Sequence, residues 1–380
     1  MIQTQSHLQA LRLCILSLCL SAVAICGYAK PKANIPLLQS EPYDTIIDGR
    51  HVGLYTITNG KIAAQITNYG GFIVSLFAPD RDGKYANLVT NYPSIHQYMN
   101  YNLGMVGPSV GRFANRIALG KFSLDGKDYQ VTVNNGRHTL HGGTKGFDHV
   151  VWDVVKAGKK QVVLSCVLPD GTDGFPGTLT TTLTYSITSD NGLQVLYEAT
   201  TDAPTVVNMT THSYFNLNGI GEGDIMTHQL TVNADAITET DREGIPSGKL
   251  TPVEGTPYDF RTATTLGDRI AQMRGFGFGF GGQRPEIPEG KVMQYDNNFC
   301  LNHTSAKAVE KVVTLYAPES GRKMEVWNNH PGIQIYTGAR RAIALESQMY
   351  PDSPNHPEFP STILRPGEKY THTCIYKFVK

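Results

Sequence analysis

The sequence has no excess of charge of either sign. Its 380 residues include 33 lysines and arginines and 33 aspartates and glutamates, so the formal net charge is +0. A nucleic-acid-binding protein needs a basic surface to neutralise phosphates, and this balance argues against such a partner. Apolar residues make up 40% of the chain, which is enough for a substantial hydrophobic core.

Cysteine is also scarce, and its spacing excludes two kinds of site. Three of the six cysteines lie within the first 26 residues, and the others are Cys166, Cys300 and Cys374. Three dispersed cysteines are too few for a disulfide scaffold, and their spacing does not suggest zinc. The glycine-rich run at 274–282 lacks the lysine and hydroxyl that a phosphate-binding loop needs. The sequence therefore gives no sign of a metal or nucleotide site.

The N-terminal segment has the layout of a secretory signal peptide. Residues 1–12 end in a positive charge, and the apolar run LCILSLCLSAVAICGYA follows and closes on small residues. A membrane anchor is the alternative, but the run is short for a bilayer span and no positively charged cluster follows it. A lipoprotein would need a small residue before Cys26, where the chain has Ile25. We expect residues 1–29 to be a signal peptide cleaved after Ala29, and the mature protein to be secreted or periplasmic without a stable membrane anchor.

Beyond the N-terminal segment, apolar and polar residues alternate over most of the chain. In residues 179–187, Leu179, Leu183 and Tyr185 fall on one face while threonines occupy much of the other. Residues 192–201 and 370–378 alternate in the same way. Strict alternation is typical of half-buried antiparallel strands.

Helical periodicity is rare by comparison. Short helices are expected at 94–100 and 263–273, and the glycine-rich run at 274–282 is expected to be a flexible loop. No proline- or serine-rich linker divides the chain. The sequence therefore predicts a single all-β domain over residues 35–380, built as a large sandwich or a closed sheet.

Polar side chains gather in a few stretches that are otherwise apolar or rich in turns. Charged residues make up only 17% of the chain, so such clusters are informative. His212 is the one side chain of its stretch that ordinarily titrates near neutral pH, and it is either a hydrogen-bonded core histidine or a group that moves protons. The stretches are GRFANRIALG (111–120), LHGGTKGFDHVVWDV (140–154), NMTTHSYFNL (208–217), YDNNFCL (295–301) and ALESQMYPDSPNHPEFPS (344–361).

Taken in this order, the stretches resemble the aldose 1-epimerase (galactose mutarotase) family. The resemblance runs from about residue 40 to the C-terminus, and SPNHPEFPSTILRPGE (353–368) is particularly distinctive. It also includes DGTDGFPG (170–177), IPSGKLTPVEGTPYDFR (245–261) and PGIQIYTG (331–338). The fold that the resemblance implies is a large antiparallel β-supersandwich, which agrees with the alternation described above.

The resemblance implies interconversion of the α and β anomers of free aldohexoses such as D-galactose and D-glucose. Anomerisation removes the proton of the C1 hydroxyl and protonates the ring oxygen O5, so it needs one base and one acid. By the resemblance, Glu346 is the general base and His212 is the general acid. The implied partner is a monosaccharide, and neither a cofactor nor a metal is required.

The resemblance also implies a set of substrate-binding side chains, each of which has a plainer alternative. Arg116 is otherwise a surface ion pair, His141 a turn residue beside two glycines, and Asp296 a cap of the glycine-rich loop. Gln334 is otherwise a strand-surface residue, and Tyr214 a core residue. The full set is Asn115, Arg116, His141, Tyr214, Asp296 and Gln334.

Two positions depart from the usual pattern of the family. Ser347 stands where threonine is more common, and Asn297 stands where a histidine commonly follows the aspartate. Arg112, close to the substrate-binding pair in the same stretch, is expected to be structural. Three functions stay open besides anomerisation: carbohydrate binding without turnover, epimerisation of a phosphorylated hexose, and glycoside cleavage by two carboxylates. The sequence leaves the preferred aldose and the oligomeric state undecided.

Overall fold

The computed structural model describes residues 34–101, 105–273, 294–305, 307–338 and 341–379. By their contacts, the residues from Ile35 onward form one compact unit. The expected signal peptide (1–29) and the expected flexible loop (274–282) lie outside the described residues.

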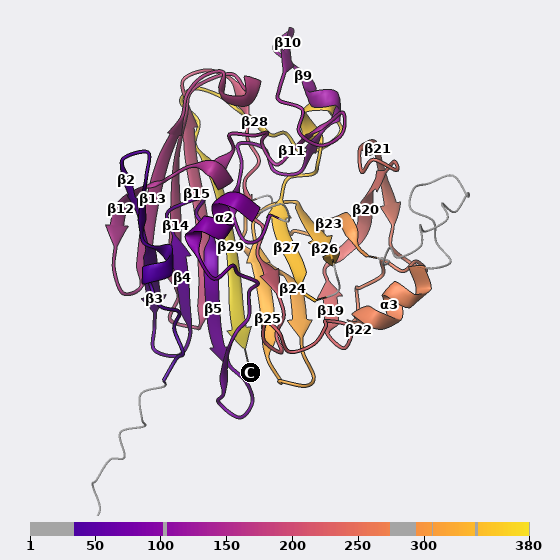
Figure 1. The fold of residues 1–380 in the computed structure, drawn as a ribbon. Helices are drawn as coiled ribbons and strands as arrows, with labels where there is room; N and C mark the ends of the chain where they lie inside the picture. Colours follow the sequence, from indigo (N-terminus) through magenta and orange to yellow (C-terminus); the bar gives the residue numbers. More distant parts are fainter. Residues whose placement is uncertain (1–33, 102–104, 274–293, 306, 339–340, 380) are drawn as a thin grey trace, which may run out of the picture. The chain divides into compact units, whose positions relative to one another are not determined.

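Antiparallel strands dominate the described part of the chain, as the alternation predicts, and the largest sheet there has nine of them. From one edge to the other, its strands are β12 (Asp153–Ala157), β13 (Gln161–Leu168), β14 (Leu179–Ile187), β15 (Gly192–Thr201), β29 (Tyr370–Val379), β25 (Lys323–Asn328), β24 (Glu310–Tyr316), β19 (Gln229–Val232) and β22 (Thr264–Thr265). The three strands expected from alternation are β14, β15 and β29. They are adjacent in the middle of this sheet (Figure 1).

Within the described residues, two further sheets have six and four strands. The six-stranded sheet has the order β18 (Tyr214–Phe215), β27 (Ile343–Gln348), β26 (Gly332–Tyr336), β23 (Asp296–Leu301), β20 (Ala234–Thr240) and β21 (Pro246–Pro252). The four-stranded sheet has the order β3 (Leu54–Thr58), β4 (Ala63–Thr67), β5 (Ile73–Pro79) and β6 (Tyr85–Asn87).

Short strand pairs and helical turns complete the described chain. The pairs are β1 (Thr45–Ile47) with β2 (Arg50–Val52), β7 (Ser109–Val110) with β17 (Thr210–Thr211), β8 (Arg116–Ile117) with β11 (Thr139–Leu140), β9 (Lys121–Leu124) with β10 (Lys127–Gln130), and β16 (Thr205–Val206) with β28 (Ile363–Leu364). The α-helices α2 (Ile95–Tyr101) and α3 (Leu266–Gln272) confirm both expected helices to within a few residues. The 3₁₀ turns are η1 (Glu41–Tyr43), η2 (Ala118–Gly120), η3 (Phe147–His149), η4 (Thr172–Gly174) and η7 (Ser353–Asn355).

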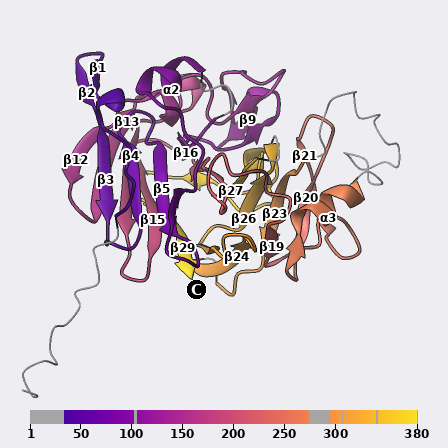
Figure 2. The same cartoon turned by 60° about the horizontal axis from the view of Figure 1, so that its bottom comes forward.

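The two smaller sheets pack against the nine-stranded sheet, so the fold is an all-β sandwich. Figures 1 and 2 show β3, β4 and β5 beside β13 to β15, and β26 and β27 beside β25 and β29. Across the second contact, the Tyr376 hydroxyl of β29 donates to the Leu345 carbonyl of β27 at 3.1 Å, and the rings of Tyr376 and Phe215 lie 4.7 Å apart. Apolar side chains from all three sheets join one buried cluster. Burial of such area is the main driving force for the fold.

Strand register decides which side chains of the six-stranded sheet face away from this core. Cross-strand partners share a face, and the ladder pairs Asn298 with Gln334 and Gln334 with Glu346. The alternate residues Ile335 and Leu345 belong to the apolar cluster on the other side. One face of β23, β26 and β27 is therefore apolar, and the other carries amides and carboxylates.

None of the helices in the described part of the chain has the length and apolar character needed to span a membrane.

Candidate active site

Glu346 stands on the polar face of β27 and is almost completely buried. Its residue is 1% exposed, although its neighbours on this face are polar. Among the described residues, its Oε2 has no hydrogen-bond partner. A buried carboxyl oxygen without a partner is costly to stability, and such groups are concentrated at functional sites.

His212 faces this carboxyl from the segment that follows β17. Because β17 is only two residues long, the backbone here is held by single bonds such as that from the His212 N–H to the Pro108 carbonyl at 2.9 Å. The imidazole Nε2 lies 3.4 Å from Oε1 of Glu346, and both side chains are less than 8% exposed. These two ionisable side chains are therefore buried and close to each other.

His141 completes a group of three ionisable side chains. Its backbone has a φ of +53°, and that of Asn115 has a φ of +61°, a region that non-glycine residues seldom adopt. The two residues hold each other: the His141 N–H donates to the Asn115 carbonyl at 3.0 Å, and the Asn115 N–H donates to Nδ1 of His141 at 3.2 Å. Backbone strain of this kind is typical of functional sites.

The contact between Asn115 and His141 also fixes the tautomer of the imidazole. A backbone N–H can only donate, so Nδ1 of His141 is an acceptor and the proton of the neutral ring is on Nε2. Burial lowers the pKa of His141 well below its usual range, and the neighbouring His212 and Arg116 lower it further. His141 is therefore a neutral N–H donor whose ring lies 5.3 Å, centroid to centroid, from that of His212.

The glycines after His141 explain the LHGG sequence. Gly142 has a φ of +89°, and a Cβ on it would lie 2.4 Å from the Gly111 carbonyl oxygen. A side chain at this position would separate the His141 turn from the segment that carries Asn115. Glycine is thus required here for the close approach of two backbone segments.

Burial shifts the pKa values of the central pair in opposite directions. It raises the pKa of Glu346 well above the ordinary 4.5, with Asp296 adding to the effect, and it lowers the pKa of His212 below the ordinary 6.5. Over the pH range between the two shifted values, the pair holds one proton. Because burial favours the neutral form of each group, that proton is on Glu346 and the ring of His212 is neutral, so the pair has one group that can donate a proton and one that can accept it.

A chain of polar side chains continues from the pair across the strands. Arg116 Nη2 lies 3.4 Å from Oδ2 of Asp296, and the Gln334 amide donates to Oδ1 of Asp296 at 2.6 Å. The Gln348 amide in turn donates to the Gln334 oxygen at 3.4 Å. Asp296 and Gln334 are therefore held in fixed orientations, with directional acceptors and donors suited to hydroxyl groups.

The proline-rich stretch after β27 supports Arg116 from behind. The Asp352 N–H donates to the Arg116 carbonyl, and Oδ1 of Asp352 accepts from the Ala118 N–H, both at 2.9 Å. The Asn115 side chain accepts from the Arg116 N–H at 2.9 Å. Asp352, which directly precedes the SPNHP sequence, thus fixes the strand end that presents the guanidinium.

Aromatic rings border the pair on one side. The ring of Tyr214, on the edge strand β18, lies 4.9 Å from that of His212, and the ring of Tyr336 lies 6.0 Å from that of Tyr214. Register places both tyrosines on the polar face, paired with the same residue, Ala344. Tyr214 therefore borders the site, and its alternative as a core residue does not hold.

All the expected site residues lie together in the structure. Arg112, which the sequence places close to two of them, has a different environment. Arg112 is 1% exposed, and its guanidinium donates to the carbonyls of Pro176 and Gly177 at 2.7 Å each and to Oγ1 of Thr205 at 3.2 Å. Its role is structural, as expected. Three residues of the polar face were not predicted from the sequence: Asn298, Tyr336 and Gln348. Their position two residues from an expected site residue on the same strand was the available signal.

The comparisons with known proteins show the family of this chain. The sequence profile described as aldose 1-epimerase matches residues 53–377. The chain belongs to the aldose 1-epimerase family. Galactose mutarotase of Sus scrofa is 35% identical over 341 residues, which are 85% of this chain and 93% of the relative. Aldose 1-epimerase of Escherichia coli (strain K12) is 33% identical over 352 residues, covering 87% of this chain and 96% of the relative.

Solved structures show the same fold. A GalM/aldose epimerase homologue from C. elegans has a TM-score of 0.77 at 28% identity, covering 86% of this chain and 99% of that one. Galactose 1-epimerase from Lactobacillus acidophilus NCFM has a TM-score of 0.73 at 25% identity, covering 88% of this chain and 96% of that one. The expected fold is confirmed, and the protein is an isomerase of the aldose 1-epimerase type.

Three side chains of this epimerase have the composition of a metal site. One ligand atom from each of His141, His212 and Glu346 lies within 4.8 Å of the other two. Metal binding through Nε2 of His141, however, would require the ring proton on Nδ1, where the Asn115 N–H already points. The histidine is therefore set up as a hydrogen-bond donor.

The two departures from the family pattern lie on the opposite face of the six-stranded sheet. Asn297 and Ser347 alternate with Asp296 and Glu346, so their side chains point away from the polar face. Ser347 contacts the nine-stranded sheet instead, through Asn328 and a histidine of β29. Neither substitution changes a side chain that faces the site.

The epimerase also contains GPSVG (107–111), which matches the Gly-x-Ser-x-Gly spacing of a serine-hydrolase elbow and was not among the predicted sites. Ser109 lies in β7 and is fully buried, whereas an elbow serine is exposed at a strand-to-helix turn. The match is therefore a coincidence of spacing.

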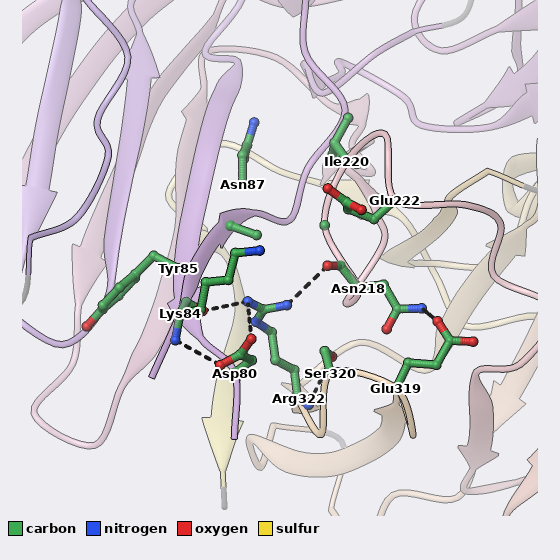
Figure 3. Close-up of a pocket in the computed structure, with 12 residues that line it drawn as sticks. Asp80, Lys84, Tyr85, Asn87, Asn218, Ile220, Glu222, Glu319, Ser320 and Arg322 are labelled. Atoms are coloured by element: carbon green, nitrogen blue, oxygen red, sulfur yellow. Dashed lines mark hydrogen bonds and ion pairs between the residues drawn. The ribbon is translucent and has the colours of Figure 1, made fainter. Parts of the chain in front are cut away.

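A pocket of about 490 Å³ lies between the β5–β6 turn, the loop after β18 and the β24–β25 turn (Figure 3). Arg322 lines it and ties these segments together. Its guanidinium donates to the carbonyls of Lys84 and Leu217 at 2.8 Å each, and lies 3.8 Å from Asp80. The donors of Arg322 are used within the protein, so its role is structural.

Proposed function

We propose that the protein interconverts the α and β anomers of free aldohexoses such as D-galactose and D-glucose, with Glu346 as general base and His212 as general acid. The observation that carries the proposal is the buried contact of 3.4 Å between Nε2 of His212 and Oε1 of Glu346. In an aldopyranose, O1 and O5 are bonded to the same carbon. A base for one and an acid for the other must therefore be close neighbours, as these two groups are.

The proposed reaction moves one proton in each direction. Glu346 takes the proton of the C1 hydroxyl, the C1–O5 bond breaks with its electron pair going to O5, and His212 donates its proton to O5. After rotation about the C1–C2 bond, O5 returns a proton to His212 as it attacks the aldehyde carbon, and Glu346 returns a proton to O1. The pair holds one proton throughout: in the proposed step it is on His212 before ring opening and on Glu346 after it, and the second arrangement is the one that the opposite pKa shifts favour.

The remaining side chains bind and orient the sugar in this proposal. His141 donates its Nε2 proton near O5 and stabilises the charge that develops there, because burial keeps its ring neutral. Asn115, Arg116, Asp296 and Gln334 bind the outer hydroxyls, and Tyr214 borders the ring. The Arg116 guanidinium already faces Asp296 at 3.4 Å, which favours a neutral sugar over a phosphorylated one.

The test is the optical rotation of freshly dissolved α-D-galactose and α-D-glucose with the purified protein, beside Glu346→Ala and His212→Ala. We expect faster decay to the equilibrium rotation, and its loss in both variants. A matched control is His51→Ala, because His51 is an exposed histidine paired with Asp44. Decay no faster than in buffer would refute the proposal for these sugars, and sugar binding without turnover would favour the carbohydrate-binding alternative.

We also propose that the protein is exported and acts on extracytoplasmic sugars, on the strength of the sequence of residues 1–29. Expression of the full-length chain followed by fractionation and N-terminal sequencing tests this. A mature chain beginning at Lys30 outside the cytoplasm supports export, and an intact chain in the cytoplasm refutes it.

A further inference from the structure

A buried histidine behind the site takes no part in the chemistry proposed above. His372, on β29, is fully buried at the contact between the nine-stranded and six-stranded sheets. Its Nδ1 lies 2.9 Å from the Met209 carbonyl, and its Nε2 lies 2.9 Å from Oγ of Ser347. The Asn328 amide donates to the same Oγ at 2.6 Å.

The direction of each hydrogen bond in this group follows from its partners. A carbonyl only accepts, so Nδ1 of His372 carries a proton and donates it to Met209. Burial lowers the pKa of His372 to about 3, so the ring is neutral and Nε2 is an acceptor. Ser347 therefore donates to Nε2 and accepts from Asn328. Each link of this buried chain therefore pairs a donor with an acceptor, and paired buried networks of this kind are rigid.

This hydrogen-bond chain passes beside Glu346 at Ser347 and ends near His212 at Met209. Ser347 directly follows Glu346 in β27, and Met209 precedes His212 by three residues. The strand at 210–211 is too short to hold this segment by itself. The Tyr197 hydroxyl donates to the Thr210 carbonyl at 2.7 Å, so β15 also holds it in place.

We propose that the hydrogen-bond chain Asn328–Ser347–His372–Met209 is a positioning element that sets the separation between Glu346 and His212. This hydrogen-bond chain crosses the core and connects the backbone next to Glu346 with the backbone next to His212. The inference rests on the proposed function, since a separation matters only if both groups act on one sugar. A misplacement of about 1 Å at a catalytic group costs up to about 100-fold in rate.

The experiment compares three substitutions at Ser347 by steady-state polarimetry with galactose. Ser347→Ala removes the hydroxyl, Ser347→Cys keeps its approximate volume with a much weaker donor, and Ser347→Thr keeps the hydroxyl. We expect kcat to fall by about 10- to 100-fold in the alanine and cysteine variants, with KM unchanged. We expect the threonine variant to restore kcat.

Two controls separate positioning from general stability and from the proposed chemistry. Ser75→Ala removes another fully buried serine hydroxyl, which donates to Gln65 at 2.8 Å in the four-stranded sheet, and should leave kcat unchanged. Glu346→Gln should be inactive. Thermal unfolding shows whether each variant is folded. If Ser347→Ala does not fold, the kcat of Ser347→Cys tests the positioning role.

A folded alanine or cysteine variant with the kcat of the wild type would overturn the positioning role. An equal loss of kcat in Ser75→Ala would also overturn it, because the effect would then be one of stability. If Glu346→Gln is active, both this inference and the proposed acid–base assignment fail. An inactive Glu346→Gln beside a fully active Ser347→Ala removes the positioning role alone.

Discussion

Replacement of Glu346 by glutamine should change the pH dependence of stability in a way that reports the shared proton. In the wild type, the folded pair holds one proton between its shifted pKa values. The unfolded chain holds two protons below pH 4.5, one between pH 4.5 and 6.5, and none above pH 6.5 on this pair of sites. Stability depends on the difference between the two states in bound protons.

The sign of the effect follows from that difference. Glu346 has a raised pKa in the fold, so its contribution is full below pH 4.5 and declines as the pH rises. His212 has a lowered pKa in the fold, so its contribution declines as the pH falls below 6.5. The two slopes cancel between pH 4.5 and 6.5, and above pH 6.5 the wild type loses up to about 1.4 kcal/mol per pH unit from this pair.

Glu346→Gln removes the contribution of Glu346 to the pH dependence of the unfolding free energy. The variant should lose stability below pH 6.5, because His212 remains, and should be flat above it. Above pH 6.5, its stability relative to the wild type should therefore rise with pH, by at most about 1.4 kcal/mol per pH unit. All other titrating groups are common to both proteins and cancel in the difference.

Chemical denaturation of both proteins at half-unit pH intervals from 5 to 8.5 provides the assay. The variant should be inactive in polarimetry, with a kcat at least about 100-fold lower, since general bases contribute that much or more. A difference in unfolding free energy that stays constant above pH 6.5 would show that the folded pair does not retain its proton. The reasoning from burial would then be wrong.

Two further predictions concern the support of the site. Gln348→Leu should raise KM about 3- to 10-fold with little change in kcat, because Gln334 loses the donor at 3.4 Å that fixes its amide; an unchanged KM in polarimetry would contradict this. Gly142→Ala should destabilise the fold by about 1–3 kcal/mol from its backbone conformation alone, plus the overlap with Gly111. Gly126→Ala is the control, since its φ is +76° but nothing lies within 4 Å of the added Cβ, and an equal loss in both variants would exclude the overlap as a cause.

Much of the fold was predictable because its core strands alternate cleanly. Along β14, Leu179, Leu183 and Tyr185 are fully buried while Thr180 is exposed, as a half-buried strand requires. The pairing of strands was not predictable. β15 pairs with β29 across about 180 residues of sequence, and no local pattern specifies such a partner.

For the site, too, the sequence predicted what depends on local motifs and did not predict what depends on contacts between distant segments. Glu346 and His212 were identified because their surrounding stretches match those of a family. Gln348 and the contact between Ser347 and His372 were not identified, because the sequence alone does not distinguish a buried amide or hydroxyl from that of an ordinary strand residue. The positive φ of His141 was also hidden, since it depends on the approach of another backbone segment.

The central position of β29 has a consequence for how this protein reaches its active state. In the order of the nine-stranded sheet, β29 stands between β15 and β25, so it joins the run β12–β15 to the run β25–β24–β19–β22. Until it docks, both neighbours present open edges that can pair with other chains. Long-range pairing of this kind is slow, and open strand edges are prone to aggregation until they are paired. Because β29 also carries His372, the strand that closes the sheet is the one that contacts Ser347 and Met209 beside the proposed acid–base pair. Appearance of activity during refolding should therefore coincide with closure of the sheet.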